Sequence, residues 1–204
     1  MKNKYPEARR SIHDFDKEYR EGAHWDTDKP STAALKLLPF LKKNAYILDD
    51  GCGAGRDCIF FAKKGFRVSG IDMSPAGIAL AKQRSKGLHG IDFFVGKGED
   101  LPYKDNTFDA GYTAYVFEGP TFPKVASEIS RVIKPHGYFS IAMFLKTSYE
   151  KPSERDSDTP LPFVLESLQP YFEIKEQEVD SYWETDDAGS HEHERLQMLL
   201  VNKK

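Results

Sequence analysis

The chain has 204 residues, a length that suits one domain with a sizeable core. Hydrophobic residues make up 39% and charged residues 30%, with a formal net charge of −3, so the composition excludes a disordered chain and gives no general attraction to nucleic-acid phosphates. No apolar run approaches the about 20 residues that span a bilayer, and Cys52 and Cys58 lie in one short stretch rather than in a disulfide framework. We therefore expect a cytoplasmic protein with neither nucleic acid nor membrane as a partner, either a monomer or a homodimer.

The N-terminal region predicts a helical cap. Residues 7–20 are polar with a helical pattern, a loop around Trp25 follows, and a second helical pattern with one apolar face ends near residue 41. We expect residues 1–44 to form a cap or lid on a domain that spans residues 45–204 as one compact unit.

From residue 45 onward strands and helices alternate. Predicted strands cover residues 45–48, 66–71, 91–95, 108–113, 138–145, 172–179 and 196–201. Predicted helices cover residues 56–64, 74–85, 122–133 and 161–168. This alternation implies βαβ crossovers and a mainly parallel sheet, whereas the last two strands have no helix between them and are expected to pair antiparallel. The fold class is therefore α/β: a doubly wound, Rossmann-like sheet of seven strands with an antiparallel C-terminal hairpin.

Two polar stretches interrupt the C-terminal half. Residues 146–159 are long for a loop, which predicts a mobile lid or a disordered excursion. Residues 181–194 are also polar and are expected to connect the last two strands.

The most informative segment is a glycine-rich turn between a predicted strand and a predicted helix. It reads Ile-Leu-Asp-Asp-Gly-Cys-Gly-Ala-Gly-Arg over residues 47–56. Glycine permits positive φ and lets a ligand approach the main chain, and ligands of open α/β sheets bind beyond the carboxyl ends of the strands. The G-x-G-x-G spacing differs from the G-x-G-x-x-G of dinucleotide binders. The carboxylate of Asp49, just before the glycines, would repel a pyrophosphate but suits a positively charged amino-acid group.

A second acid, Asp72, ends the next predicted strand. An acid at this position can accept hydrogen bonds from both hydroxyls of a ribose. The alternative is that Asp72 only caps the helix that begins after Ser74. The glycine turn upstream favours the ribose interpretation.

With these motifs the chain resembles the class I S-adenosylmethionine (SAM)-dependent methyltransferases. Five segments carry the resemblance in the family's order: residues 47–55, the strand that ends at Asp72, and residues 98–103, 106–112 and 131–138. The resemblance implies SAM as the cofactor and methyl transfer as the reaction. Trp25-Asp26 with Pro30, together with Gly55-Arg56-Asp57, further resembles the tellurite-resistance and thiopurine methyltransferase branch, whose members methylate soft nucleophiles such as thiols and chalcogen oxyanions.

The resemblance also implies which residues bind SAM. The expected cofactor-binding residues are Trp25, Asp49, Gly51, Gly53, Asp72, Met73, Glu99, Asp100 and Tyr112. Asp49 would hold the amino group of the methionine moiety, and Met73 would pack on adenine unless it is an ordinary core residue. Many relatives carry an acid for the adenine amino group where this chain has Lys97, so Glu99, Asp100 or the backbone is expected to replace that contact. Trp25 would cover SAM or the acceptor, or instead anchor the N-terminal helix.

The acceptor side is expected after the fourth strand, where the methyl group should point. The candidate catalytic residues are Tyr112, Tyr115, Glu118 and His193, each of which has a plain packing or surface role as its alternative. Since SAM carries an activated methyl group, the protein mainly aligns the nucleophile and excludes water. We expect a small-molecule methyl acceptor.

His191, Glu192, His193 and Glu194 form a dense cluster with three interpretations: a base, a metal site or a solvated loop. Two histidines two residues apart on an extended segment point the same way, which suits a metal. No third ligand can be identified from the sequence, so the solvated loop is preferred and no metal is assigned.

Two other classes of function compete. An NAD(P)-dependent oxidoreductase is disfavoured by the glycine spacing and by Asp49. A non-catalytic SAM-binding sensor or partner subunit fits the same motifs, because the cofactor site and the acceptor site are separable.

Overall fold

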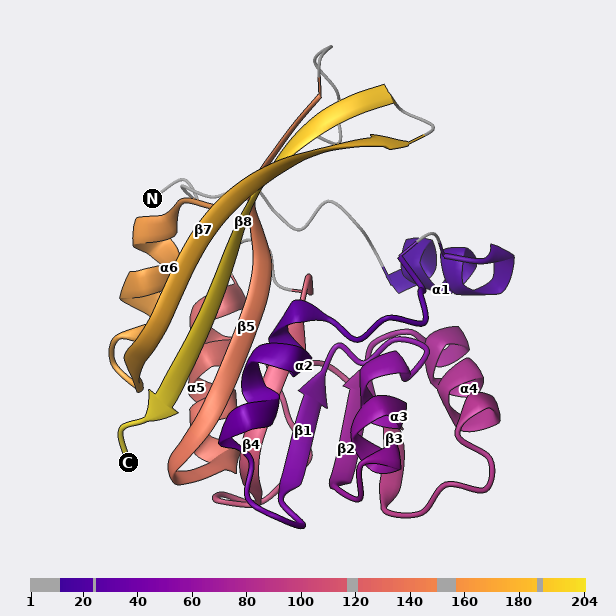
Figure 1. The fold of residues 1–204 in the computed structure, drawn as a ribbon, viewed down its shortest axis with the longest axis vertical. Helices are drawn as coiled ribbons and strands as arrows, with labels where there is room; N and C mark the ends of the chain where they lie inside the picture. Colours follow the sequence, from indigo (N-terminus) through magenta and orange to yellow (C-terminus); the bar gives the residue numbers. More distant parts are fainter. Residues whose placement is uncertain (1–11, 24, 117–120, 150–156, 187–188) are drawn as a thin grey trace.

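The computed structural model describes residues 12–23, 25–116, 121–149, 157–186 and 189–204. One sheet has the order β3-β2-β1-β4-β5-β8-β7, and the two-residue β6 (Ser157–Asp158) pairs with β5 (Figure 1). The strands are β1 (Tyr46–Asp50), β2 (Arg67–Asp72), β3 (Ile91–Val95), β4 (Phe108–Ala114), β5 (Ile133–Tyr149), β7 (Phe172–Asp186) and β8 (Gly189–Asn202). The neighbouring strands β3, β2, β1, β4 and β5 pair in parallel, and β8 is antiparallel to both β5 and β7. The predicted fold class is therefore confirmed.

Helices cover both faces of this sheet. They are α1 (Ile12–Glu21), α2 (Thr32–Leu37), α3 (Arg56–Lys63), α4 (Pro75–Arg84), α5 (Phe122–Val132) and α6 (Leu161–Leu168), and the 3₁₀ turn η1 (Leu38–Phe40) follows α2. Apolar residues of α2, α3 and α4 pack on one face, and those of α5 and α6 pack on the other (Figure 1). The central strand β1 is buried on both sides. Ile47 packs in the apolar cluster with α2, α3 and α4, and Leu48 packs in the cluster with α5 and α6.

The prediction for the two polar stretches was wrong in part. Strand β5 continues to Tyr149. Within the stretch expected as a loop, residues 181–186 form the end of β7 and residues 189–194 form the start of β8. These strand ends and β5 extend together beyond the parallel part of the sheet (Figure 1). The sequence predicted a loop because one face of these strands lies in solvent and carries polar residues. Their backbone hydrogen bonds come from neighbouring strands, and the sequence does not show which strands will be neighbours.

The N-terminal region contains the two expected helices. Residues Ala33, Ala34 and Leu37 of α2 are buried in the apolar cluster that also holds α3, so α2 belongs to the helical layer of the sheet. The division at residues 44 and 45 stays a prediction. Most of the expected lid, residues 150–156, lies outside the described residues. No helix in the described part of the chain is long and apolar enough to cross a membrane.

Candidate active site

The glycine turn lies at the carboxyl ends of the parallel strands, between β1 and α3. Gly51, Gly53 and Gly55 have φ values of +83°, +51° and +79°, which only glycine adopts without strain. The N–H of Gly51 donates to the carbonyl of Ile71 at 2.8 Å, which fixes the turn to the end of β2. A Cβ at Gly51 would lie 2.1 Å from Cγ2 of Val116, so the segment that follows β4 packs directly against the turn.

Asp72 holds this turn against the next helix. One carboxylate oxygen accepts from the N–H of Gly53 and the other from the N–H of Ser74, both at 2.8 Å. Burial raises the pKa of Asp72, which these two hydrogen bonds oppose. Asp72 thus contacts the N–H of Ser74, the residue that itself caps α4 by accepting from the N–H of Gly77. The ribose role stays a prediction, which fits the geometry because each carboxylate oxygen can accept a further hydrogen bond.

Helix α1 lies over the same turn. A carboxylate oxygen of Asp16 accepts from the N–H of Ala76 at 2.7 Å and from Oγ of Ser74 at 2.9 Å, so α1 is attached to the first turn of α4. A Cβ at Gly53 would lie 2.1 Å from the hydroxyl of Tyr19, also on α1. Burial raises the pKa of Tyr19 above its usual value, with the charge of Asp72 contributing next. Sequence reasoning did not single out Tyr19, because only the packing of α1 brings it here.

Trp25 packs within this cover. Its ring makes edge contacts with Phe15 at 6.2 Å and Tyr19 at 6.1 Å between centroids, and its indole N–H donates to the hydroxyl of Tyr19 at 3.3 Å. Its carbonyl accepts from Nη1 of Arg56 at 3.4 Å. These contacts are those of an anchor for α1, and a direct contact of Trp25 with SAM stays a prediction.

Asp49 points toward α3. One of its carboxylate oxygens accepts from the hydroxyl of Tyr112 at 2.7 Å and from the thiol of Cys58 at 3.1 Å. Burial, followed by the charge of Asp57, raises the pKa of Asp49 to about 7. Tyr112 is fully buried, so its contact with Asp49 favours a supporting role beneath the glycine turn. Both residues keep their cofactor and catalytic roles only as predictions.

Asp50 is a candidate that sequence reasoning missed. Its side chain is buried, and Oδ2 has no hydrogen-bond partner among the described residues. That oxygen lies 2.4 Å from where a Cβ of Gly98 would be, directly beneath the loop after β3. Burial raises the pKa of Asp50 well above its usual value, and the charges of Asp49, Asp72 and Glu99 add to this. The available signal was a second acid directly after Asp49, at the end of a strand whose Ile47 and Leu48 are buried and apolar.

The loop after β3 carries the expected adenine-side residues. Glu99 and Met73 are half-buried, whereas Asp100 and Lys97 are exposed. The N–H of Asp100 donates to the carbonyl of Lys97 at 3.1 Å, which closes a turn around Gly98. The roles of these side chains at adenine stay predictions.

The end of β4 brings Tyr115 beside the extended strands. Tyr115 has φ +60°, an uncommon conformation for an aromatic residue, and its N–H donates to the carbonyl of Ala142 at 2.7 Å. Its ring lies 4.6 Å from that of Phe144, and its hydroxyl accepts from Nη1 of Arg195 at 3.4 Å. Glu118, the other candidate in this segment, lies outside the described residues.

His193 reaches this group through Phe144. The two rings stack with centroids 4.1 Å apart and an interplanar angle of 18°. The preferred interpretation of a solvated loop was wrong, because His193 lies in β8 and only 7% of it is exposed. The structure thus brings Tyr115 and His193 onto one aromatic surface, and their catalytic roles stay predictions.

Comparisons with known proteins agree with this geometry. A family model described as a methyltransferase domain matches residues 41–189. A probable phthiotriol/phenolphthiotriol dimycocerosates methyltransferase 2 of Mycobacterium ulcerans is 35% identical over 57% of this chain and 48% of its own length. A sterol 4-C-methyltransferase of Caenorhabditis elegans is 29% identical over 58% of this chain and 37% of its own length. The chain spans about half or less of the length of these relatives.

Solved structures show the same fold. One, from work on the conversion of a disulfide bond into a thioacetal group during echinomycin biosynthesis, superposes with a TM-score of 0.73 at 19% identity. The match covers 94% of this chain and 93% of that one. The family match over most of the chain supports the five sequence motifs and the glycine turn at the strand ends. The chain belongs to the methyltransferase domain family, and its fold is the one found in SAM-dependent methyltransferases.

Proposed function

We propose that this protein transfers the methyl group of SAM to a small-molecule acceptor. The observation that carries the proposal is the carboxylate of Asp72, which holds the turn of Gly53 and the start of α4 at one edge of the sheet. SAM supplies a methyl group already activated on a sulfonium sulfur. The chain's own residues then have to bind SAM, orient the acceptor and exclude water.

The residues present suit the cofactor. Asp72 offers further acceptor positions for the ribose hydroxyls, next to the positive-φ turn of Gly51 and Gly53 against which Val116 and Tyr19 pack. The unpartnered carboxyl oxygen of Asp50 under Gly98 supplies the acid that Lys97 does not, and could accept a hydrogen bond from the adenine amino group. A buried polar atom without a partner is costly, so a ligand that reaches it gains affinity.

The acceptor surface is aromatic and apolar where the structure describes it. Tyr115 and Val116 are 38% and 40% exposed, and the ring of Phe144 packs on that of Tyr115. The Mycobacterium and Caenorhabditis relatives are named for dimycocerosates and for a sterol. We infer that the acceptor has an apolar body that lies on these side chains.

Within that class we retain a soft nucleophile, a thiol or a chalcogen oxyanion, as the specific acceptor group. A thiol with a pKa near 8.5 needs little help to form its thiolate, so it can react on this surface without a strong base. The likeness to the tellurite-resistance and thiopurine methyltransferase branch stays a prediction of the same kind. The buried thiols of Cys52 and Cys58 fit the proposed cytoplasmic location.

We propose that the partners are the small acceptor alone, with the chain as a monomer or a homodimer and without nucleic acid. The net charge of −3 supports this, because it offers no general attraction to a polyanion. A filter-binding measurement with RNA and DNA, and light scattering of the purified chain, would check both parts.

Two measurements test the function. Titration calorimetry should show one SAM site per chain and no preference for NAD. Methyl transfer from isotope-labelled SAM should then be screened over thiols, chalcogen oxyanions, sterol-like alcohols, amines and small acids. Turnover on a thiol or oxyanion supports the specific proposal, and turnover only on an alcohol or amine overturns it. Tight SAM binding with no turnover on any acceptor would favour a non-catalytic SAM-binding protein.

A further inference from the structure

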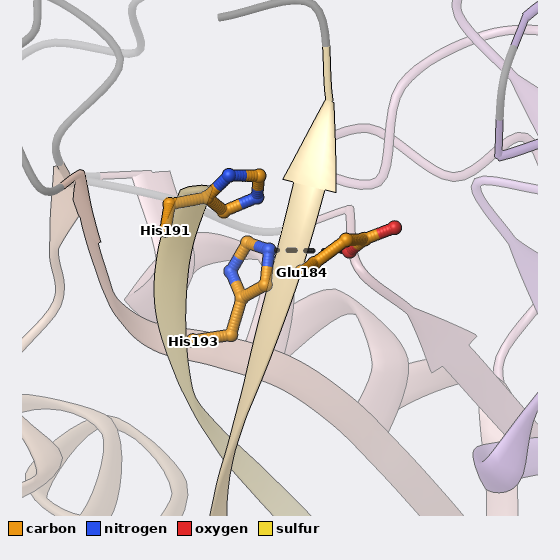
Figure 2. A group of neighbouring side chains, drawn as sticks. All are labelled: Glu184, His191 and His193. Atoms are coloured by element: carbon orange, nitrogen blue, oxygen red, sulfur yellow. Dashed lines mark ion pairs between the residues drawn. The ribbon is translucent and has the colours of Figure 1, made fainter. Parts of the chain in front are cut away.

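The hairpin of β7 and β8 carries a cluster of ligating side chains outside the cofactor site. We propose that Glu184, His191 and His193 bind one divalent transition-metal ion of the zinc class. One potential ligand atom from each residue lies within 4.8 Å of the others (Figure 2). The proposal concerns a second site and does not rest on the methyltransferase activity.

Strand register places the three residues on one face. Glu184 on β7 pairs with His191 on β8, and Tyr182 pairs with His193. Side chains two residues apart on a strand point to the same side, so the register puts both histidines beside Glu184. Figure 2 shows the two imidazole rings one above the other, with the carboxylate of Glu184 on the side toward which each ring turns a nitrogen.

The other ring nitrogens are held by oxygen atoms. Nδ1 of His191 lies 3.1 Å from the carbonyl of Gly189, and Nδ1 of His193 lies 3.0 Å from Oγ1 of Thr147. A carbonyl can only accept, so Nδ1 of His191 carries the proton and Nε2 has the lone pair. Metal-binding histidines commonly donate their second ring nitrogen in this way, which orients the ligating nitrogen. Nε2 of His193 lies 3.5 Å from Oε2 of Glu184, so it faces the same centre.

The separations are close to those of a metal site. With bonds of about 2.0–2.2 Å to nitrogen and oxygen, tetrahedral ligand atoms lie about 3.3–3.6 Å apart. The pair His193–Glu184 already meets this value, and the remaining separations are at most 4.8 Å, so they need closure of up to about 1.5 Å. The side chain of Glu184 is 51% exposed, so it has room to move, and small rotations of the two imidazole rings supply the rest.

The donor set selects the class of metal. Two imidazoles and one carboxylate suit zinc and its neighbours in the first transition series, whereas calcium and magnesium prefer oxygen ligands. Three protein ligands leave a fourth position open for an outside ligand. Phe144 and Tyr182 pack on His193 at 4.1 Å and 5.2 Å between centroids, and Phe144 also contacts Tyr115. The metal would therefore lie next to the aromatic surface at the end of β4.

Calorimetric titration of the tag-free chain with Zn²⁺ tests the proposal. We expect one ion per chain, and cobalt substitution should give the visible absorption bands of a low-symmetry Co²⁺ site. Glu184→Gln keeps the size of a half-exposed side chain but removes its charge, and should weaken Zn²⁺ binding at least about tenfold. Thr147→Val should weaken it by about 10–100-fold through the orientation of His193. His89→Ala, which removes a histidine from a distant turn, should leave binding unchanged.

The outcomes separate a metal site from a polar cluster. Loss of binding in Glu184→Gln and in His191→Ala, with circular dichroism unchanged, supports the site. If His191→Ala does not fold, Glu184→Gln decides, because its partly exposed side chain is not needed for the core. The proposal is overturned if the wild-type chain binds no Zn²⁺ stoichiometrically, or if Glu184→Gln binds it as tightly as the wild type.

Discussion

The glycine turn and the β7–β8 hairpin lie at the same end of the sheet, but their acidic side chains differ in whether a cation pairs with them. At the turn, Asp49, Asp50 and Asp72 are largely buried, and no described cation forms an ion pair with them. Their hydrogen bonds come from backbone N–H groups, a hydroxyl and a thiol, and the pKa of each is raised. On the hairpin, Asp180 is paired with Arg195, which holds the pKa of Asp180 below its usual value.

This difference indicates what each region is built for. Buried acids without cations destabilise the folded chain at neutral pH, a cost that a protein bears where a ligand uses those groups. Partly exposed ion pairs cost little and contribute little, so the hairpin can keep its shape over a wide pH range.

Asp72→Ala should have the largest effect, because it removes the acceptor for the N–H groups of Gly53 and Ser74. Leaving two largely buried donors without partners costs about 2–6 kcal/mol, and loss of the ribose contacts should lower SAM affinity at least about tenfold. Chemical denaturation and calorimetry measure the two quantities. Asp72→Asn is the matched control, because its single acceptor oxygen retains one of the two bonds. Unchanged SAM affinity in a folded Asp72→Ala protein would show that Asp72 only caps α4.

Asp49→Asn should change how stability depends on pH. The pKa of Asp49 is about 7 in the folded chain against 3.8 in the unfolded one, so the folded state holds the proton longer. Ionisation of Asp49 therefore lowers the free energy of unfolding by about 4 kcal/mol as pH rises from about 4 to about 7, and its effect is constant above pH 7.

The Asp49→Asn variant should lose less stability across this window than the wild type. Chemical denaturation at a series of pH values gives the free energy of unfolding of both proteins. Other carboxyl groups titrate alike in both, so their contributions cancel in the difference. Parallel curves would mean that Asp49 ionises normally in the folded chain. Asp50→Asn should act with the same sign, because burial also raises the pKa of Asp50.

Phe144→Leu should affect turnover more than SAM binding. Its ring lies between Tyr115 and His193, so its loss removes two ring contacts at the proposed acceptor surface, at a cost of about 1–2 kcal/mol. We expect a KM for the acceptor raised several-fold, with SAM affinity unchanged in calorimetry. Phe60→Leu on α3, which also removes a half-buried ring contact, serves as the control and should keep its KM. Equal changes of KM in the two variants would show that Phe144 does not contact the acceptor.

Breaking the ion pair of Arg195 and Asp180 should have the smallest effect. Both side chains are partly exposed, at 20% and 37%, so a double-mutant cycle with Arg195→Gln and Asp180→Asn should give a coupling of about 1 kcal/mol or less. Added salt should reduce it further. A coupling of several kcal/mol would show that the hairpin depends on its charges as strongly as the glycine turn does.

Much of the parallel half of the protein could be predicted from the sequence because its signals are local. The buried strand, the three glycines and the acid at the end of the next strand lie close together in the chain, and each constrains the backbone at its own position. The family match over residues 41–189 confirms the class of protein that these motifs indicated. The helices between the strands were likewise visible from their apolar spacing and caps, such as Ser74 before Pro75.

Only the tertiary structure decided which of the polar residues meet. Nothing local shows that Tyr19 rests on Gly53, because that contact depends on how α1 docks on α4. Likewise Glu184 becomes a neighbour of His191 only through the register of β7 and β8, which hydrogen bonds between distant segments set. The sequence by itself determined the succession of strands and helices along the chain and the position of the glycine turn, since these follow from local backbone preference and burial. The side-chain clusters required the folded chain, since contacts between segments far apart carry no local signal.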